Sequence, residues 1–180
     1  MDDMPSQSSS LNQDLIQSLK DLLGEKGWTD DQEIISPHTS DWRGNFVGHS
    51  DFMVSPSTTE EVSEVMKLCH RYGQPVCPQG GNTGLVNGGI AYGEIVLSMA
   101  RMNNVRSIDT FNNSLVAEAG CILANVHTAA DEQERYFPLS LGSQGSCTIG
   151  GLISTNAGGV AVLRYGMMRD LLLGMEVVMA

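Results

Sequence analysis

The sequence predicts a mixed fold of helices and strands, built around a small parallel α/β unit. Three observations lead to this prediction. A helical pattern at residues 58–73 is followed by a short apolar segment at residues 75–77. A glycine-rich segment then leads to a second apolar segment at residues 94–99. Strands that follow a helix in this order usually pair in parallel.

The first elements follow from apolar spacing. Leucine and isoleucine recur at helical intervals over residues 11–23, so we expect a helix there, with Ser10 as its N-cap and Gly24 or Gly27 as its end. Residues 28–52 lack a clean period, and we expect them to be irregular with short strands near Ile34 and Phe52.

The helix at residues 58–73 has the clearest signals in the chain. Thr58 and Glu61 have the spacing of a capping box, and Gly73 closes the apolar pattern. Further along, alternating side chains predict a half-buried strand at residues 115–119, and a helix is expected at residues 123–134.

The last ten residues, 171–180, are mostly apolar and include no turn residue at their end. We therefore expect a strand there. An apolar strand needs neighbouring strands to pair with, which suggests that the chain is the N-terminal part of a longer protein.

Charge separates the chain into two parts. The 180 residues carry a net charge of −11, and residues 1–66 hold 13 acidic and 3 basic residues, against 8 and 7 in the remainder. Such a protein repels nucleic acid, whereas its nearly neutral, glycine-rich part can accept an anionic ligand.

Four cysteines show neither a CxxC pair nor a spacing typical of metal sites; they are Cys69, Cys77, Cys121 and Cys147. We expect buried thiols in a reducing compartment and no metal site. Residues 1–10 lack the features of a targeting signal, and the longest apolar run is too short to cross a membrane. These observations favour a soluble, cytoplasmic protein.

The first candidate site directly follows the predicted strand at residues 75–77. Glycines at such a place let several backbone N–H groups point into one concavity, which suits a diphosphate. Neither a Rossmann nor a Walker pattern is present, and the same residues would also suit a turn without a ligand. The residues of this first cluster are Pro78, Gln79, Gly80, Gly81, Asn82, Thr83, Gly84 and Leu85.

A second cluster holds six glycines within residues 142–159. Its polar side chains are neutral donors and acceptors, which suit the edge of a flat heterocycle, although a glycine-rich hinge would have a similar composition. The candidate binding residues in this cluster are Gly142, Ser146, Ile149, Gly150, Gly151, Thr155, Asn156 and Gly159.

Other sites have less support. No nucleophile elbow, zinc-protease motif or calcium loop is present, and the four histidines are scattered along the chain. Arg164 and Arg169 could neutralise a phosphate or a substrate carboxylate, or could equally pair with Asp170 and Glu176.

With both glycine clusters in view, residues 41–180 resemble the D-2-hydroxyglutarate and D-lactate dehydrogenase branch of the PCMH-type, or vanillyl-alcohol-oxidase-like, FAD flavoproteins. The resemblance is strongest at QGGNTG (79–84), at TIGGLISTNAGG (148–159) with LRYG (163–166), and at LGMEVV (173–178). The Asp41-Trp42 pair and the Glu118-Ala119-Gly120 segment fall in the same order.

The resemblance implies an α+β fold, namely a PCMH-type FAD-binding domain that is truncated at its C-terminus. It comprises a small parallel α/β subdomain and a mainly antiparallel α+β subdomain, with FAD between them. On this basis residues 1–47 form a tail and lead helix, and residues 48–180 form the incomplete FAD-binding domain. The first cluster would hold the diphosphate and the second would line the flavin. Relatives with covalent flavin have a histidine where this chain has Asn82, so FAD is expected to be noncovalent.

The function implied by the resemblance is oxidation of a small-molecule D-2-hydroxy acid by hydride transfer to flavin N5. The catalytic base is expected beyond residue 180, so no residue of this chain is assigned as catalytic. A homodimer of the full-length protein is also expected. Two alternatives stay open: another flavoprotein oxidase of this fold, acting on glycolate or an alditol, and a noncatalytic module that binds a nucleotide or another anion.

Overall fold

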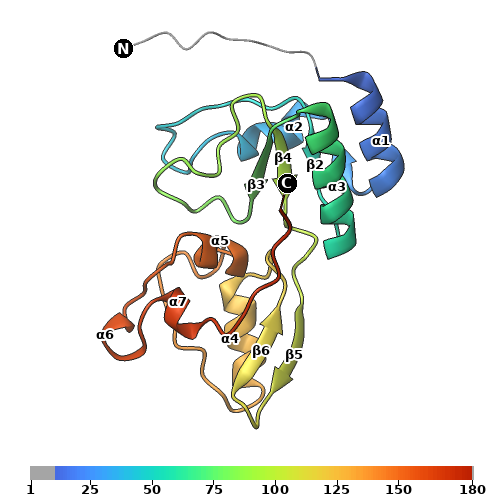
Figure 1. The fold of residues 1–180 in the computed structure, drawn as a ribbon. Helices are drawn as coiled ribbons and strands as arrows, with labels where there is room; N and C mark the ends of the chain where they lie inside the picture. Colours follow the sequence, from blue (N-terminus) through green and yellow to red (C-terminus); the bar gives the residue numbers. More distant parts are fainter. Residues whose placement is uncertain (1–10, 180) are drawn as a thin grey trace.

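A computed structural model describes residues 11–179. The chain forms two halves, which Figure 1 shows one above the other. The upper half contains a four-stranded sheet in the order β1-β2-β4-β3, and the lower half contains the two-stranded sheet of β5 and β6. This arrangement confirms the expected PCMH-type architecture, with a small sheet of mainly parallel pairing followed by an antiparallel hairpin.

The upper sheet is short and largely buried. Its strands are β1 (Trp28–Thr29), β2 (Met53–Val54), β3 (Val76–Gln79) and β4 (Ile95–Ser98). Strand β4 pairs in parallel with both β2 and β3, and only β1 runs antiparallel to its neighbour. All four residues of β4 are buried, as expected for a central strand of a parallel sheet.

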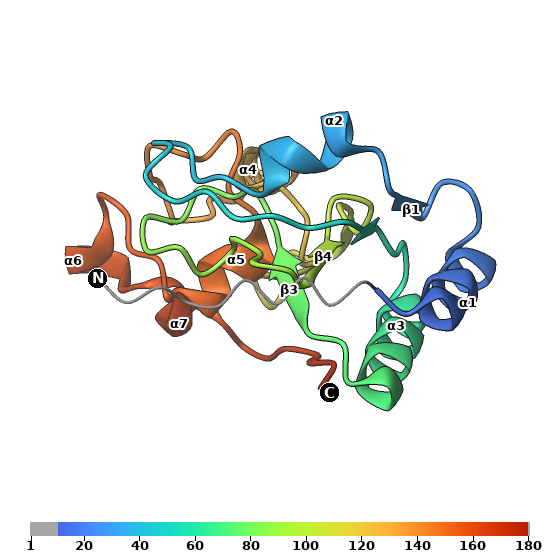
Figure 2. The ribbon, with the colours of Figure 1, turned by 90° about the horizontal axis from the view of Figure 1, so that it is seen from above.

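Helices cover both faces of this sheet, as Figure 2 shows from above. On one face, α1 (Gln13–Leu23) and α3 (Thr59–Tyr72) pack their leucines and valines against Ile95 and Leu97. On the other face, Ile35 of the short helix α2 (Gln32–Ile35) packs with Met53 and Val96. The alternation along β4 therefore divides the core into two layers.

The caps explain where the two long helices begin and end. Asn12 caps α1 by accepting hydrogen bonds from the backbone N–H groups of Asp14 and Leu15, so the helix begins later than the expected cap Ser10, which lies outside the described residues. Gly24 ends α1, as one of the two expected candidates. Thr58 caps α3 through the N–H of Glu61 at 3.1 Å.

Glu61 does not complete the expected capping box with Thr58. Its carboxylate accepts a hydrogen bond from the N–H of Ser57 at 2.6 Å, one residue before the cap. At the other end of α3, Gly73 has a φ of 63°, in the left-handed region, and both its position and its role match the expectation.

The lower half has its own core around Leu123, Val126 and Leu139. Its hairpin joins β5 (Val105–Asp109) to β6 (Ser114–Ala117), and four helices follow in order. These helices are α4 (Leu123–Asp131), α5 (Ile149–Ser154), α6 (Val162–Tyr165) and α7 (Met168–Leu171).

Three expectations about individual elements are wrong. The segment near Ile34 is helix α2 instead of a strand, because Asp31 accepts a hydrogen bond from the N–H of Glu33 at 2.9 Å and starts a helical turn. Helix α4 ends at Asp131, three residues before the expected end. Residues 172–179 form no strand, since no described strand lies beside them to accept or donate ladder hydrogen bonds.

Residues 172–179 instead run back along the molecule towards the upper half (Figure 1). Val178 packs against the upper core, and the hydroxyl of Thr59 donates a hydrogen bond to the carboxylate of Glu176 at 3.2 Å. Within residues 11–179, no helix is both long and apolar enough to cross a membrane.

Candidate functional site

The first glycine cluster begins where β3 ends. In parallel sheets, ligands usually bind beyond the carboxyl ends of the strands, and residues 80–89 form a loop at this end of β3. The loop is exposed at Gly81 and Gly84, while Gln79 at its base is only 3% exposed. The loop therefore begins directly after a buried polar residue, Gln79, in the edge strand β3.

The side chain of Gln79 holds this loop in place. Its amide nitrogen donates hydrogen bonds to the carbonyl oxygens of His38 and Gly89, each at 2.7 Å. Its amide oxygen lies 2.6 Å from Nδ1 of His38, which therefore donates in this pair. One buried amide thus joins both ends of the loop and fixes them to the segment after α2.

The backbone of this loop offers several free donors. Among the described residues, the N–H groups of residues 81–85 have no hydrogen-bond acceptor. Asn82 has a φ of 49°, which asparagine tolerates better than most residues, and its side-chain amide donates to the carbonyl oxygen of Ser40 at 2.8 Å. Consecutive free N–H groups with few side chains among them are the typical components of an anion cradle.

The second glycine cluster is held by the segment that follows β6. The N–H of Gly150 donates to the carbonyl oxygen of Ala119 at 2.8 Å, and the N–H of Ile149 donates to that of Cys121 at 2.9 Å. A Cβ atom on Gly150 would lie 2.9 Å from the Cβ of Ala119, so only glycine permits this approach.

The two glycine clusters, which lie far apart in the sequence, meet directly. A Cβ atom on Gly81 would overlap the carbonyl oxygen of Ser146, and one on Gly80 would overlap the hydroxyl of Thr148. The structure thus brings the upper and lower halves together at the two segments that the sequence had singled out.

The remaining candidate residues do not share one kind of environment. No described atom lies within 4 Å of a Cβ built on Gly142 or Gly84, whereas Gly159 packs against the backbone of Ser140. The polar side chains of Thr155 and Asn156 serve the protein itself: the Thr155 hydroxyl donates to Gly151 O, and Asn156 Oδ1 accepts from the N–H of Arg169. Pro78 and Leu85 are exposed.

Arg164 and Arg169 form none of the ion pairs that were considered for them, as far as the described chain shows. Asp170 accepts from the N–H of Met167, and Glu176 accepts from Thr59. The guanidinium of Arg164 instead lies over the ring of Tyr165, at 5.3 Å from its centroid.

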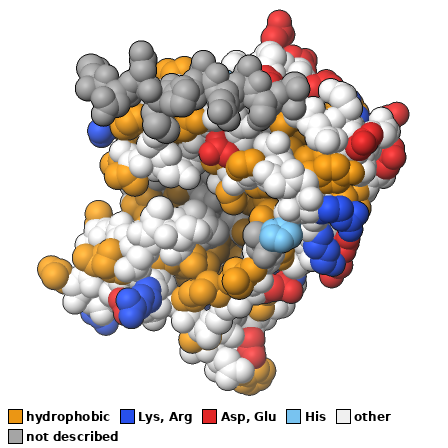
Figure 3. All heavy atoms as spheres, turned by 45° about the horizontal axis from the view of Figure 1, so that its top comes forward, with side chains coloured by type: hydrophobic (Ala, Val, Ile, Leu, Met, Phe, Trp, Pro, Cys, Tyr) orange, Lys and Arg blue, Asp and Glu red, His pale blue; other side chains and the backbone are white. Residues whose placement is uncertain are grey.

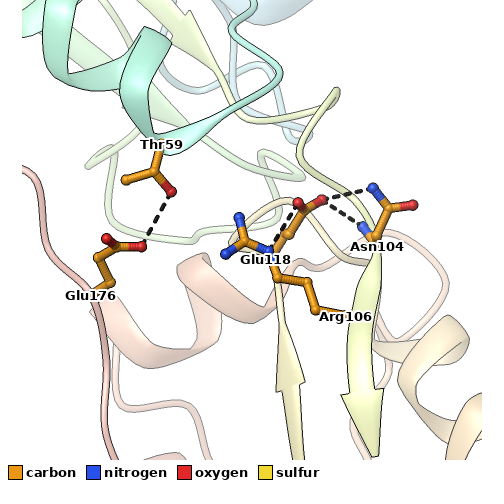
Figure 4. A network of polar contacts seen from close by, with 5 residues as sticks. All are labelled: Thr59, Asn104, Arg106, Glu118 and Glu176. Carbon is orange, nitrogen blue, oxygen red and sulfur yellow. Dashed lines mark hydrogen bonds and ion pairs between the residues drawn. The ribbon is translucent and has the colours of Figure 1, made fainter.

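Glu118 precedes Ala119, the residue that holds Gly150 of the second cluster, and Figure 4 shows its contacts with Asn104 and Arg106. Its carboxylate accepts two hydrogen bonds from Asn104, both at 2.9 Å, and forms an ion pair with Arg106 at 3.2 Å. Burial raises the pKa of Glu118, but the donors of Asn104 and Arg106 outweigh burial and bring the pKa below its ordinary value. Glu118 is thus charged where it supports Ala119.

Sequence reasoning assigned no role in this site to His38 or Glu118, and it did not name Thr148 as a binding residue although Thr148 lies within the second cluster. His38 is separated from Gln79 by some forty residues, and nothing in its neighbourhood signals the pairing. Glu118 and Thr148 stand inside matched motifs, but their contacts depend on a chain fold that no spacing rule provides.

Figure 3 shows a face that is hollowed between the two halves, with mainly uncharged atoms around the hollow. A concavity of about 410 Å³ lies elsewhere, at the end of α3, and is lined by Met66, Cys69, His70, Gly73, Gln74, Pro75 and Val76. Neither glycine cluster lines this concavity.

Comparison with known proteins gives the class of this chain. Residues 50–180 match the family described as FAD binding domain. The chain therefore belongs to the FAD binding domain family. The fold agrees: the structure resembles that of alkyldihydroxyacetonephosphate synthase with a TM-score of 0.82 at 22% identity, covering 96% of this chain and 33% of that one.

Similarity in sequence indicates a narrower class of protein than the fold does. The chain is 42% identical over 173 residues to D-2-hydroxyglutarate dehydrogenase, mitochondrial, from Arabidopsis thaliana, which covers 96% of this chain and 31% of that protein. It is 35% identical over 179 residues to a Schizosaccharomyces pombe protein named as a mitochondrial D-lactate dehydrogenase, covering 95% and 34%. The chain is thus a homologue of FAD-dependent D-2-hydroxy acid dehydrogenases, and it spans about a third of their length.

The expectation of a cytoplasmic protein is wrong. It rested on the composition of residues 1–10, the pattern of the cysteines and the length of the apolar runs, whereas the names of the relatives from Arabidopsis thaliana, Schizosaccharomyces pombe and Bos taurus give the mitochondrion. These sequence features do not determine the compartment.

The residues at the two loops fit the diphosphate of FAD. The loop at residues 81–85 supplies free N–H groups, and the glycines leave room for close approach of a ligand to the backbone. Thr148 adds a buried hydroxyl that has no hydrogen-bond partner among the described residues.

Proposed function

We propose that this chain is the FAD-binding part of an oxidoreductase that converts a D-2-hydroxy acid, of the D-2-hydroxyglutarate or D-lactate class, into the 2-oxo acid. The observation that carries the proposal is the direct contact between Gly80–Gly81 and residues 146–148, which forms one site from two loops. The identity to D-2-hydroxyglutarate dehydrogenases over 96% of the chain supports the substrate class.

In this proposal the first cluster, residues 78–85, holds the diphosphate through its free N–H groups. The second cluster lines the flavin through Gly142, Ser146, Ile149, Gly150, Gly151, Thr155, Asn156 and Gly159. When bound, FAD supplies the acceptor for the electrons that the hydroxy acid loses. Residues 11–179 contain no cluster of side chains that could hold a metal ion, and the base and carboxylate-binding groups are proposed to come from other parts of the protein.

FAD is proposed to be noncovalent. The side chain of Asn82 has no nucleophilic ring nitrogen, and its amide is already bonded to Ser40. The net charge of −11 supports the further proposal that nucleic acid is not a partner. The boundary between a lead segment, residues 1–47, and the FAD-binding domain, residues 48–180, is likewise a proposal.

The test uses the purified full-length protein. We expect flavin absorbance near about 450 nm, release of all flavin after acid precipitation, and turnover of D-2-hydroxyglutarate or D-lactate with an artificial electron acceptor. Light scattering on the same sample would show whether it is the proposed homodimer.

Other outcomes would contradict the proposal in different ways. A protein without flavin, even after FAD is added, would be a noncatalytic module. Turnover of glycolate or an alditol with oxygen, at a rate equal to that with the artificial acceptor, would indicate an oxidase. Flavin that stays attached after precipitation would refute noncovalent binding.

A further inference from the structure

Residues 172–179, which we call the strap, form a second connection between the two halves. The chain first passes from the upper to the lower half after β4, and the strap then returns from the end of α7 to the upper half (Figure 1). A single covalent connection lets two halves turn about it as a hinge, whereas a second crossing restricts that rotation. The strap is therefore placed to fix the position of one half relative to the other.

The lower end of the strap is anchored in the core of the lower half. It follows α7, whose Met168 is only 4% exposed, and Leu171 packs against the same core. The N–H of Met168 donates a hydrogen bond to the carbonyl oxygen of Ala157 at 2.9 Å. Since Ala157 lies within the second glycine cluster, the strap begins at a helix that is bonded to that cluster.

Two side chains attach the upper end of the strap. Val178 packs against the upper core, and the carboxylate of Glu176 accepts a hydrogen bond from the hydroxyl of Thr59 at 3.2 Å, as Figure 4 shows. Thr59 is the first residue of α3, where the helix dipole also favours a negative charge. Within the described chain, residues 173–179 form no hydrogen bond with other backbone groups. The attachment therefore depends on these side chains.

We propose that Thr59, Glu176 and Val178 are positioning residues, which hold the strap on the upper half and so keep the two glycine clusters at the spacing that FAD needs. This role rests on the proposed function, in which FAD contacts the first cluster in the upper half and the second cluster in the lower half. None of the three residues belongs to either cluster, so they act through the relative position of the halves and not by touching the cofactor.

A loosened strap should weaken a ligand that contacts both halves and leave unchanged one that contacts a single half. FAD spans both clusters in the proposed site, whereas ADP carries the diphosphate without the flavin and needs only the first cluster. We expect Val178→Ser to weaken FAD binding about tenfold and Thr59→Val about threefold, because lost apolar packing costs more than an exposed hydrogen bond. Both variants should bind ADP with the wild-type Kd.

The experiment measures the Kd of FAD for the full-length apoprotein by flavin fluorescence, and the Kd of ADP by competition with FAD. Val177→Ser is the matched control, because Val177 is the neighbouring residue of the strap and is 61% exposed. This control should leave both Kd values unchanged. Thr59→Ser keeps the hydroxyl and should restore the wild-type Kd of FAD.

Each other result overturns the proposed role. Wild-type FAD affinity of Val178→Ser and Thr59→Val would show that the strap does not set the spacing of the clusters, while the proposed function would stand. Equal weakening of FAD and ADP would indicate a general loss of structure. Equal weakening of FAD by Val177→Ser and Val178→Ser would show that the packing of Val178 is not the cause. If the wild type bound no FAD, the proposed function would fail and this role with it. Should Val178→Ser not fold, Thr59→Val compared with Thr59→Ser gives the same test.

Discussion

Single residues decide whether the two loops can meet. The Cα of Gly81 lies so close to Ser146 that a Cβ would overlap a carbonyl oxygen, which cannot rotate away as a side chain could. Gly88, in the same loop, has no described atom within 4 Å of its Cβ position and has no positive φ. The loop thus contains both a glycine that the contact requires and one that it does not.

We predict that Gly81→Ala separates the loops and weakens FAD binding by at least tenfold, because the backbone must shift to avoid Ser146. Gly88→Ala should bind FAD with the wild-type Kd. Flavin fluorescence titration of both variants measures the difference. Equal affinities would show that the contact between the loops is not needed for the cofactor.

A second residue-scale prediction concerns Glu118, whose folded-state pKa lies below its ordinary value. A carboxyl with a lowered folded pKa contributes stability above its unfolded pKa of about 4.3 and loses this contribution as the pH falls through the folded pKa. Glu118→Gln should therefore reduce the free energy of unfolding at pH 7 by about 1–2 kcal/mol. The difference from the wild type should shrink below about pH 4.

Urea unfolding of the wild type and Glu118→Gln at several pH values tests this prediction. Glu25→Gln, at an exposed position, is the control and should have little effect at any pH. A loss of stability in Glu118→Gln that is equally large at pH 3 and pH 7 would contradict the electrostatic explanation.

Elements with strong local signals could be predicted from the sequence, and elements without such signals could not. Helices α1 and α3 have caps and an apolar face, and β3 and β4 are apolar segments beside glycines. By contrast, β5 has polar side chains on both faces and was missed, since its pairing with β6 comes from the hairpin and not from its own pattern. Helix α2 has only four residues, too few for a period to show.

The candidate site was likewise partly predictable. Composition alone located both glycine clusters, and the family resemblance assigned them to one cofactor. Their contact, and the bonds of Gln79 to two distant carbonyl groups, depend on tertiary structure that no single segment encodes.

At the same scale, the loop of residues 80–89 should depend on Gln79. Gln79→Ala removes the bonds to His38 and Gly89 and leaves their partly buried carbonyl groups without a donor. We expect a decrease of about 2–3 kcal/mol in the free energy of unfolding, measured in urea. Gln133→Ala, at an exposed position, should change it by less than about 0.5 kcal/mol. A Gln79→Ala variant as stable as Gln133→Ala would exclude this role.

Over the whole molecule, the four cysteines share one environment, which determines their reactivity. All four cysteines are free and buried, as expected, and burial raises the pKa of Cys69 to about 11 and raises the pKa values of Cys77, Cys121 and Cys147. Thiolates are therefore scarce near neutral pH, and none of the four is suited to nucleophilic or redox chemistry.

We predict that N-ethylmaleimide at pH 7 labels none of these four cysteines within minutes in the folded protein and labels all of them in guanidinium chloride. Peptide mass spectrometry assigns the label to each residue. Because burial suppresses the thiolate, raising the pH to 8.5 should increase labelling only slightly. Rapid labelling of any one cysteine in the folded protein would contradict its burial.

The junction at Gly81 and Ser146 has a consequence for protein engineering. Two segments that contact each other through backbone atoms cannot be redesigned separately, because a larger side chain in either segment displaces the backbone of the other. Mutational libraries that vary both stretches jointly should recover active combinations that single-site scanning would discard.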